Sequence, residues 1–484
     1  MPARTGAQYI DGIRERAAEV YIAGQRVKDV TTHPAFAGGL RTVAGLLDMQ
    51  HDPGLRDEMV YGSPSTGDPV GLSFIMPRDG DDLKRRRKMM SNWALASCGM
   101  MGRTPDFLNV AVMSMAAAAD YCGQNRPEFK RNILDYYEYI RENDIVMTHT
   151  LVNLQRSRSV GQTPFDDRTE VALSVVKETD AGIIVRGARV LATLGPLSDE
   201  IAVYPARTRR VPAGEEGKYA FGFAIRCNSP GLKFHCRDTV DLGRSHFDHP
   251  AGSRFEEMDA IVFFDDVLVP WERVFLYNDV PLCNQWGERT NRNAHTGHQV
   301  VTKNVVKCEF MLGLASMMVE ILGSGDLPQT QRLVAELIEN LEITKALLAA
   351  SEAQASTDEW GIFCPDYRPL LVARKQMITM YPRMAEILHL LGSSSLMALP
   401  AEADLNGPLA EDIHRYLDTD TATAEERIRL FRLAWDVSCS AFGGRQTLYE
   451  RYFGGDAARN AALLYQIYDR TDARSMVEEF LSLE

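Results

Sequence analysis

The spacing of apolar residues changes twice along the chain and divides it into three regions. Up to residue 152, apolar positions recur with the spacing of a helix, as at Leu40, Val43 and Leu47. Two short β-rich runs on either side of Gly24 predict one hairpin within this region. We therefore expect an N-terminal α-helical domain over residues 1–152, with helices at residues 34–51, 81–99, 105–121 and 126–142.

Between residues 153 and 275 the pattern consists of short β-rich runs separated by turn residues. The predicted strands lie at residues 171–177, 183–193, 200–203, 220–226, 232–236 and 260–264. Since no helix-length segment separates them, we expect the second domain to be an antiparallel sheet or barrel.

Helical spacing returns in the third region, residues 276–484, over longer segments. These predicted helices lie at residues 302–323, 328–356, 368–390 and 424–442. Four long helices in series favour an antiparallel bundle. The chain is therefore assigned to the α+β class, with an N-terminal α-helical domain, a central β domain and a C-terminal helical bundle domain.

Charge and cysteine content narrow the possible functions. The chain has 53 Lys and Arg against 66 Asp and Glu, a net charge of −13, which argues against a nucleic-acid partner. Its 8 cysteines include no Cys-x-x-Cys pair, so neither a disulfide scaffold nor a structural zinc site is expected. Residues 1–21 lack the apolar stretch of a signal peptide, and the longest apolar run, residues 110–119, covers about half of a bilayer. We expect a cytoplasmic protein with no membrane partner.

The common nucleotide-binding and catalytic motifs are absent. No GxxxxGK[ST] loop and no GxGxxG after a strand are present, so the chain has no NAD(P)H site of the common kind, and HExxH and GxSxG are missing as well. The densest positive run, residues 84–88, precedes apolar residues at helical spacing and predicts a solvated helix face. His295 and His298 lie about one helical turn apart, but no nearby carboxylate or cysteine completes a site, so no metal is predicted.

Two polar residues lie where ligands often bind. Arg103 follows Gly102 and precedes a proline that begins a helix, so its guanidinium lies at a helix junction. There it can meet an anion or phenolate, or pair with a carboxylate such as Asp106. His149 lies where the helical region meets the β region, and clefts between domains are favoured ligand sites. The alternative hypothesis is that His149 has a purely structural role.

Several short segments match one known family in the same order along the chain. They are residues 4–10 (RTGAQYI), 30–36 (VTTHPAF), 102–106 (GRTPD), 148–151 (THTL), 191–193 (LAT), 443–446 (GGRQ) and 452–456 (YFGGD). No single segment is decisive, but their joint occurrence is specific and covers nearly the whole chain. The sequence resembles the 4-hydroxyphenylacetate 3-hydroxylase family.

This resemblance implies an acyl-CoA-dehydrogenase-like fold with a central antiparallel β-barrel and a C-terminal four-helix bundle, assembled as a homotetramer. It also implies the activity of an oxygenase component that uses FAD as FADH2, supplied by a separate NAD(P)H:flavin reductase. With O2 as co-substrate, such enzymes form a flavin C4a-hydroperoxide that hydroxylates a phenolic substrate. The missing dinucleotide motif fits this division of the reaction between two proteins.

The resemblance further implies roles for the matching residues. Arg103 is expected to face the phenolic oxygen, and His149 to lie near both the phenol and the flavin. His298, or else His295, matches the histidine that acts as a base in the chlorophenol and nitrophenol branch. Substrate-binding positions are Arg103, Phe107, His149, Ala206 and Phe453, and cofactor-binding positions are His149, Thr150, Leu151, Gln155, Arg156, Ser157, Arg158, Thr193, Arg445, Gln446, Phe453, Gly454, Gly455 and Asp456.

One position departs from the family pattern. The 4-hydroxyphenylacetate enzymes have tyrosine four residues after the arginine, where this chain has Phe107. Because the lost hydroxyl makes the pocket more apolar, we expect a halogenated or nitro-phenol that loses its substituent. The alternative substrate is 4-hydroxyphenylacetate or a tyrosine-like phenol. Alternatives of other classes are an FAD-dependent acyl-CoA dehydrogenase or dehydratase and a non-catalytic assembly protein.

Overall fold

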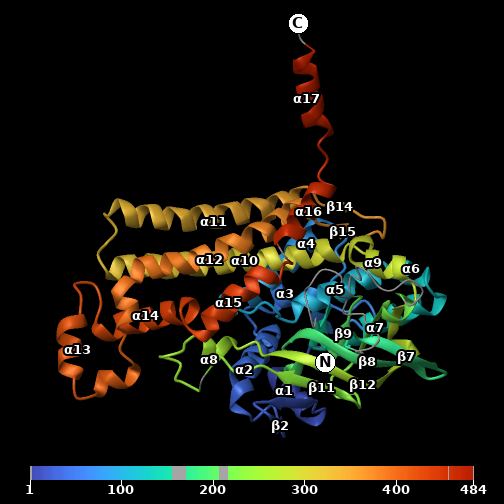
Figure 1. The fold of residues 1–484 in the computed structure, drawn as a ribbon, viewed down its shortest axis with the longest axis horizontal. Helices are drawn as coiled ribbons and strands as arrows, with labels where there is room; N and C mark the ends of the chain where they lie inside the picture. The colour runs from blue at the N-terminus through green and yellow to red at the C-terminus, as the bar shows by residue number, and fades with distance from the viewer. Residues whose placement is uncertain (1–2, 155–170, 206–215, 242, 456, 483–484) are drawn as a thin grey trace.

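The computed structural model describes residues 3–154, 171–205, 216–241, 243–455 and 457–482 of the 484-residue chain. Its parts are an N-terminal group of helices, two sheets and a long C-terminal helical bundle (Figure 1). The predicted order of helical, β and helical regions is confirmed.

Several of the N-terminal helices begin at residues that satisfy free backbone N–H groups. These helices are α1 (Gly6–Glu15), α2 (Pro34–Asp48), α3 (Arg56–Met59), α4 (Gly80–Ala96), α5 (Asp106–Ala117), α6 (Ala119–Gly123) and α7 (Pro127–Glu142). Thr5 and Gln8 form a capping box at α1, and the Asp79 carboxylate accepts two backbone hydrogen bonds in the first turn of α4. α2 and α7 begin with proline, which has no N–H to satisfy.

The strands form two main sheets. In chain order they are β1 (Glu19–Ile22), β2 (Gln25–Val27), β5 (Met147–Thr150), β6 (Val152–Asn153), β7 (Ser174–Thr179), β8 (Gly182–Thr193), β9 (Glu200–Val203), β10 (Phe221–Arg226), β11 (Leu232–Cys236), β12 (Asp259–Pro270) and β13 (Val274–Tyr277). The larger sheet has the order β2-β1-β11-β12-β8-β6, with β7 also paired to β8, and the smaller has the order β13-β10-β9-β5. Two short pairs stand apart, β3 (Val60–Gly62) with β4 (Pro69–Gly71) and β14 (Ser356–Thr357) with β15 (Phe363–Cys364).

These sheets correct the expectation of a closed antiparallel barrel. Within the described ranges no ladder closes on itself, and two strand pairs are parallel, β1 with β11 and β5 with β9. Both parallel pairs join a segment before residue 152 to one far beyond it, a pairing that leaves no trace in local residue spacing. Strands from the N-terminal region thus complete the central sheets, and the domain boundaries at residues 152 and 275 stay a prediction.

The C-terminal bundle is built from long helices. The helices after the sheets are α8 (Gly252–Phe255), α9 (Val280–Arg289), α10 (Arg292–Ile321), α11 (Pro328–Ala353), α12 (Tyr367–Met397), α13 (Ala410–Leu417), α14 (Ala424–Ser438), α15 (Ala441–Tyr452), α16 (Ala457–Ile467) and α17 (Thr471–Leu481). α10, α11 and α12 pack along one another and α14 packs against α10 and α12, which confirms the predicted bundle, while α17 projects away from the rest (Figure 1).

One helix of the described part, α12 with the residues that follow it to Asn406, is long and apolar enough to cross a membrane. This helix packs against α10, α11, α14 and α15, and a helix in contact on several sides needs apolar residues on several faces.

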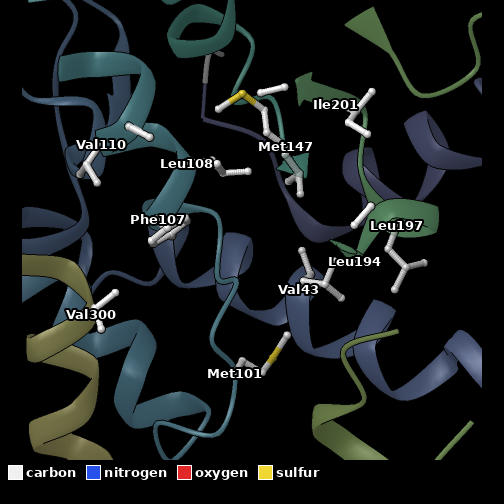
Figure 2. Packing of buried hydrophobic residues seen from close by; sticks show 14 of the residues in the cluster. Val43, Met101, Phe107, Leu108, Val110, Met147, Leu194, Leu197, Ile201 and Val300 are labelled. Atoms are coloured by element: carbon white, nitrogen blue, oxygen red, sulfur yellow. The ribbon is translucent and has the colours of Figure 1, made fainter. Parts of the chain in front are cut away.

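A single large hydrophobic cluster connects the helices to the sheets. Figure 2 shows side chains of this cluster from α2, α5, β5, β9 and α10: Val43, Phe107, Met147, Ile201 and Val300. Since the start of α5 carries Phe107 into this cluster, packing fixes the loop that immediately precedes α5.

Candidate active site

A cavity of about 970 Å³ lies where the sheets meet the bundle. Its walls come from the start of α5, from β5, β8, β11 and β12, and from α10, α12 and α15. Among the residues singled out from the sequence, those that line it are Arg103, Phe107, His149, Leu151, Thr193, Arg445 and Phe453. The fold therefore gathers side chains from widely separated parts of the chain into one space.

The guanidinium of Arg103 is held mainly by aromatic rings. It lies 4.4 Å from the ring centroid of Phe107 and 4.0 Å from that of Phe453, and its Nη1 donates to the Tyr449 hydroxyl at 2.8 Å. Burial lowers the pKa of Arg103, an effect opposed by Tyr449 and Glu257. The side chain has no ion pair with a carboxylate in the described part of the chain, so a cation with no ion-pair partner lines the cavity.

The loop before α5 sets the position of Arg103. Its backbone N–H donates to Oε1 of Glu257 at 2.6 Å, and a Cβ on Gly102 would overlap the Tyr449 hydroxyl. Asp106, the carboxylate considered as a partner, is buried and instead accepts a hydrogen bond from Gln299 at 3.1 Å. The arginine is thus anchored through its backbone, and its charge remains available to a ligand.

His149 lies on β5, opposite Ala202 of β9. Its ring centroid is 5.7 Å from that of Phe107 and 5.7 Å from that of Tyr204. Burial lowers the pKa of His149 well below its ordinary value, and the charges of Arg103 and Arg292 lower it further. The imidazole is therefore neutral at pH 7 and keeps one nitrogen lone pair that can accept a proton.

A network of ion pairs forms another wall. Arg445 donates to the two carboxylate oxygens of Asp259 at 2.7 and 2.8 Å and to Glu257 at 3.0 Å. Arg237 and the Thr193 hydroxyl also donate to Asp259, at 3.0 and 2.8 Å. Burial acts to raise the pKa of Asp259, but the arginines outweigh it and lower the pKa. These charges satisfy one another, which makes this wall rigid rather than reactive.

Other predicted cofactor residues do not line the cavity. Gln446 is buried, donates to the Met100 carbonyl at 2.8 Å and accepts from Lys307 at 3.0 Å. Thr150 is buried, Gly454 accepts a hydrogen bond from Arg374 at 3.4 Å, and Gly455 has a φ of +96° that favours glycine. Gln155, Arg156, Ser157, Arg158, Ala206 and Asp456 lie outside the described residues.

The two histidines expected to act as a base do not reach the cavity. Nε2 of His298 lies 2.8 Å from Glu352 of α11, and Nδ1 of His295 lies 3.1 Å from Arg86 of α4. The first turn of α10 presents Arg292 to the cavity instead. This arrangement does not support the expected role of either histidine, because a base must lie within hydrogen-bond reach of the proton it takes.

Two family models match the chain over most of its length. The model of the 4-hydroxyphenylacetate 3-hydroxylase N terminal matches residues 5–276, and that of the C terminal matches residues 283–482. The chain belongs to this hydroxylase family.

Individual members of the 4-hydroxyphenylacetate 3-hydroxylase family are similar over nearly the full chain. The 4-hydroxyphenylacetate 3-monooxygenase oxygenase component of Geobacillus sp. (strain PA-9) is 44% identical over 482 residues, covering 99% of this chain and 97% of that protein. The 4-nitrophenol 2-monooxygenase, oxygenase component, of Rhodococcus sp is 33% identical, covering 93% and 86%. A crystal structure of the oxygenase component (HpaB) of 4-hydroxyphenylacetate 3-monooxygenase, complexed with FAD and 4-hydroxyphenylacetate, has a TM-score of 0.94 at 42% identity, covering 99% and 98%. The expected enzyme class, the oxygenase component of a two-component monooxygenase, is confirmed.

Sequence reasoning missed several residues of this hydroxylase's cavity. Arg292, Arg374 and Tyr449 line it, and none of them stands in a recognisable motif. Glu257 and Asp259 could have been found from the sequence, because they stand next to the apolar strand segment at residues 260–264. Carboxylates buried at such a position need cationic partners.

Lys84, Arg85 and Lys88 are exposed on α4, as expected of a solvated helix face, but one residue of this run is buried instead. Arg86 is fully buried, and burial lowers its pKa to about 10. Because arginine only donates, Nδ1 of His295 accepts its hydrogen bond, and the neutral ring carries its proton on Nε2.

Ligand atoms of His295, Asp358 and Cys364 lie within 4.8 Å of one another. Nδ1 of His295 already lies 3.1 Å from Arg86, and Asp358 accepts hydrogen bonds from two backbone N–H groups and from Asn291. We therefore assign no metal to this cluster.

Proposed function

We propose that this family member hydroxylates a phenolic substrate with O2 and reduced FAD, and that a separate NAD(P)H:flavin reductase delivers the reduced FAD. The observation that carries the proposal is that a half-buried cation and a buried, neutral imidazole contact the same aromatic ring. Arg103 lies over Phe107, and the His149 ring packs against that same Phe107. A phenol bound beside both can donate a hydrogen bond to the imidazole while the guanidinium stabilises negative charge on its oxygen.

Open space along α15 supports the binding of a flat flavin ring there. Gly444 and Ala441 line the cavity, and a Cβ added to Gly444 would meet no atom within 4 Å. The space beside this glycine is therefore open to a ligand. Thr193 and Arg445 supply polar groups on the cavity wall. We propose that these residues, with Leu151 and Phe453, hold FAD, which when bound supplies the activated oxygen for the hydroxylation.

The chain's own residues then have separate tasks. Arg103 binds and stabilises the phenolate oxygen, and the rings of Phe107 and Phe453 hold the guanidinium and exclude water. The neutral ring of His149 accepts a hydrogen bond from the phenolic hydroxyl. Exclusion of water strengthens each of these electrostatic interactions, because fewer solvent dipoles screen them.

The substrate proposal follows from Phe107. Its ring offers no hydroxyl to the bound phenol, which favours a halogenated or nitro-phenol as the substrate, and the similarity to a 4-nitrophenol 2-monooxygenase supports a nitro-phenol. The second candidate is 4-hydroxyphenylacetate, which the similarity to the Geobacillus protein supports. Homotetramer formation and a cytoplasmic location stay predictions.

A single-turnover experiment tests the reaction. The protein is mixed anaerobically with reduced FAD and a phenol, O2 is added, and hydroxylated phenol and hydrogen peroxide are counted against the FAD oxidised. Hydroxylated product is expected in proportion to FAD for the true substrate class. Formation of hydrogen peroxide alone with every phenol would overturn the proposal.

Substrate preference is tested with Phe107→Tyr. If the apolar ring selects nitro-phenols, the variant raises kcat/KM for 4-hydroxyphenylacetate relative to 4-nitrophenol. An unchanged ratio would contradict the role given to Phe107.

A further inference from the structure

We propose that Arg292 and Arg374 form a second anion-binding subsite in this cavity, distinct from Arg103, that takes a carboxylate or phosphate group. The identity of the ligand rests on the proposed function, whereas the existence of the subsite rests on the geometry below.

The arginines that line the cavity differ in their partners. Arg237 and Arg445 are ion-paired with carboxylates of Glu256, Glu257 and Asp259 at 2.6 to 3.0 Å. Arg292 and Arg374 line the same cavity, but neither is ion-paired to any carboxylate in the described ranges. The hydrogen bond from Arg374 to the Gly454 carbonyl is long, at 3.4 Å, and its Nε is buried without a partner. Within the described ranges these two charges therefore have no carboxylate partner, and they lie close enough that the charge of Arg374, together with burial, lowers the pKa of Arg292.

Arg292 is held rigidly and is largely removed from solvent. Its side chain belongs to a residue only 9% exposed, and its Nε is buried without a partner. The guanidinium lies 4.8 Å from the ring centroid of Tyr204 and 4.9 Å from that of Trp286, two rings that stack at 4.6 Å. Leaving a buried charge unpaired is costly, so an anion that enters here gains a desolvated partner already in position.

The start of α10 adds to the positive potential. Arg292 and Asn293 are the first two residues of this 30-residue helix, and both line the cavity. The N-cap residue Asn291 makes no capping hydrogen bond, and its side-chain amide donates to Asp358 at 2.8 Å. The first N–H groups of a long helix are therefore left without a side-chain cap beside two unpaired arginines, and such a helix end favours anions.

Aromatic contacts connect this subsite to Arg103. Arg103 lies over Phe107, Phe107 packs against His149, His149 packs against Tyr204, and Tyr204 lies under Arg292. Both arginines thus lie near His149, whose pKa is lowered by burial and by the charges of Arg103 and Arg292. The anionic group has two possible sources, an acidic tail on the phenol or the diphosphate of FAD.

Binding measurements without turnover test the subsite and distinguish these sources. Isothermal titration compares the wild type with Arg292→Gln and Arg374→Gln, using 4-hydroxyphenylacetate against 4-methylphenol and FAD against riboflavin. If the acidic tail is the ligand, each variant binds 4-hydroxyphenylacetate about 10- to 100-fold more weakly than the wild type does, and its affinity for 4-methylphenol is unchanged. If the diphosphate is the ligand, each variant binds FAD more weakly by a similar factor, and its affinity for riboflavin is unchanged.

Controls separate anion binding from loss of structure. Arg292→Lys keeps the charge and is expected to recover part of the affinity, whereas Arg131→Gln, on the exposed surface of α7, is expected to change nothing. Unchanged affinity for both anionic ligands in both cavity variants would overturn the subsite. Selective anion binding without hydroxylated product would instead overturn the proposed function and leave the subsite standing.

Discussion

Glu257 accepts a hydrogen bond from the backbone N–H of Arg103 at 2.6 Å. The other oxygen of this fully buried carboxylate accepts one from Arg445 at 3.0 Å. One carboxylate therefore binds both the backbone of Arg103, the proposed phenolate-binding residue, and the guanidinium of Arg445 in the ion-pair network. The position of Arg103 thus depends on a residue that does not itself line the cavity.

Glu257→Gln is expected to lower stability and loosen Arg103. The amide can still accept from the Arg103 N–H, but the buried Arg445 loses one of its two counter-charges, and breaking a buried pair costs about 3–5 kcal/mol. Urea unfolding measures the loss, and kcat/KM for the phenol is expected to fall with it. Glu272→Gln, at an exposed position, serves as the control. Equal stabilities of the two variants would contradict this role.

Arg103→Met is expected to lower kcat/KM by about 10²–10³-fold, because it removes the charge placed against the phenolate oxygen while keeping a long apolar stem between two rings. Arg103→Lys is expected to retain part of the activity. The measurement is hydroxylated product per turnover with saturating reduced FAD. A Met variant as active as the wild type would remove Arg103 from the mechanism.

Glu450→Gln is expected to destabilise the protein by about 3–5 kcal/mol. Its carboxylate binds Lys303 at 2.7 Å and Lys307 at 2.6 Å, all three groups being buried. Burial lowers the pKa of Lys307 to about 8, whereas the two lysines lower the pKa of Glu450 to about 2 against the effect of burial. Denaturant unfolding measures the change.

The exposed pair of Glu309 and Lys345, 3.1 Å apart, provides a matched control for Glu450. Glu309→Gln is expected to change the free energy of unfolding by less than about 1 kcal/mol, since exposed pairs contribute little. Replacing Lys303 and Lys307 by Met in the Glu450→Gln background is expected to recover stability. If stability does not recover, the unpaired lysine charges are not the cause of the destabilisation.

Stability is expected to fall as the pH drops below about 6.5, the ordinary pKa of histidine. Burial lowers the pKa of His149, His295 and His298 in the folded protein, so the unfolded chain binds more protons in this range. Each such group contributes stability that is complete above about pH 6.5 and declines by up to about 1.4 kcal/mol per pH unit as the pH falls.

His295→Gln isolates one of these groups. The amide oxygen can still accept the hydrogen bond from Arg86, but it cannot titrate. Free energies of unfolding measured between pH 7.5 and 5.5 are expected to fall less steeply in the variant. An identical slope would assign the acid sensitivity to other groups.

Much of the fold and part of the site could be predicted from the sequence. Helix spacing and turn residues located most elements, and the segments around Arg103 and His149 identified the family. The parallel pairing of β5 with β9 could not be predicted, because it depends on contacts between distant segments. The orientation of α10 was equally hidden, since polar residues such as His295, His298 and Lys307 are buried on it and blur its apolar face.

The contact between Gly102 and Tyr449 links two positions that lie far apart in the chain. The tyrosine hydroxyl occupies the space where any side chain at residue 102 would begin. Relatives with a larger residue at position 102 should therefore carry a smaller or displaced residue at position 449. Paired substitution at these two positions would mark the family branches in which the residue equivalent to Arg103 is held by other partners.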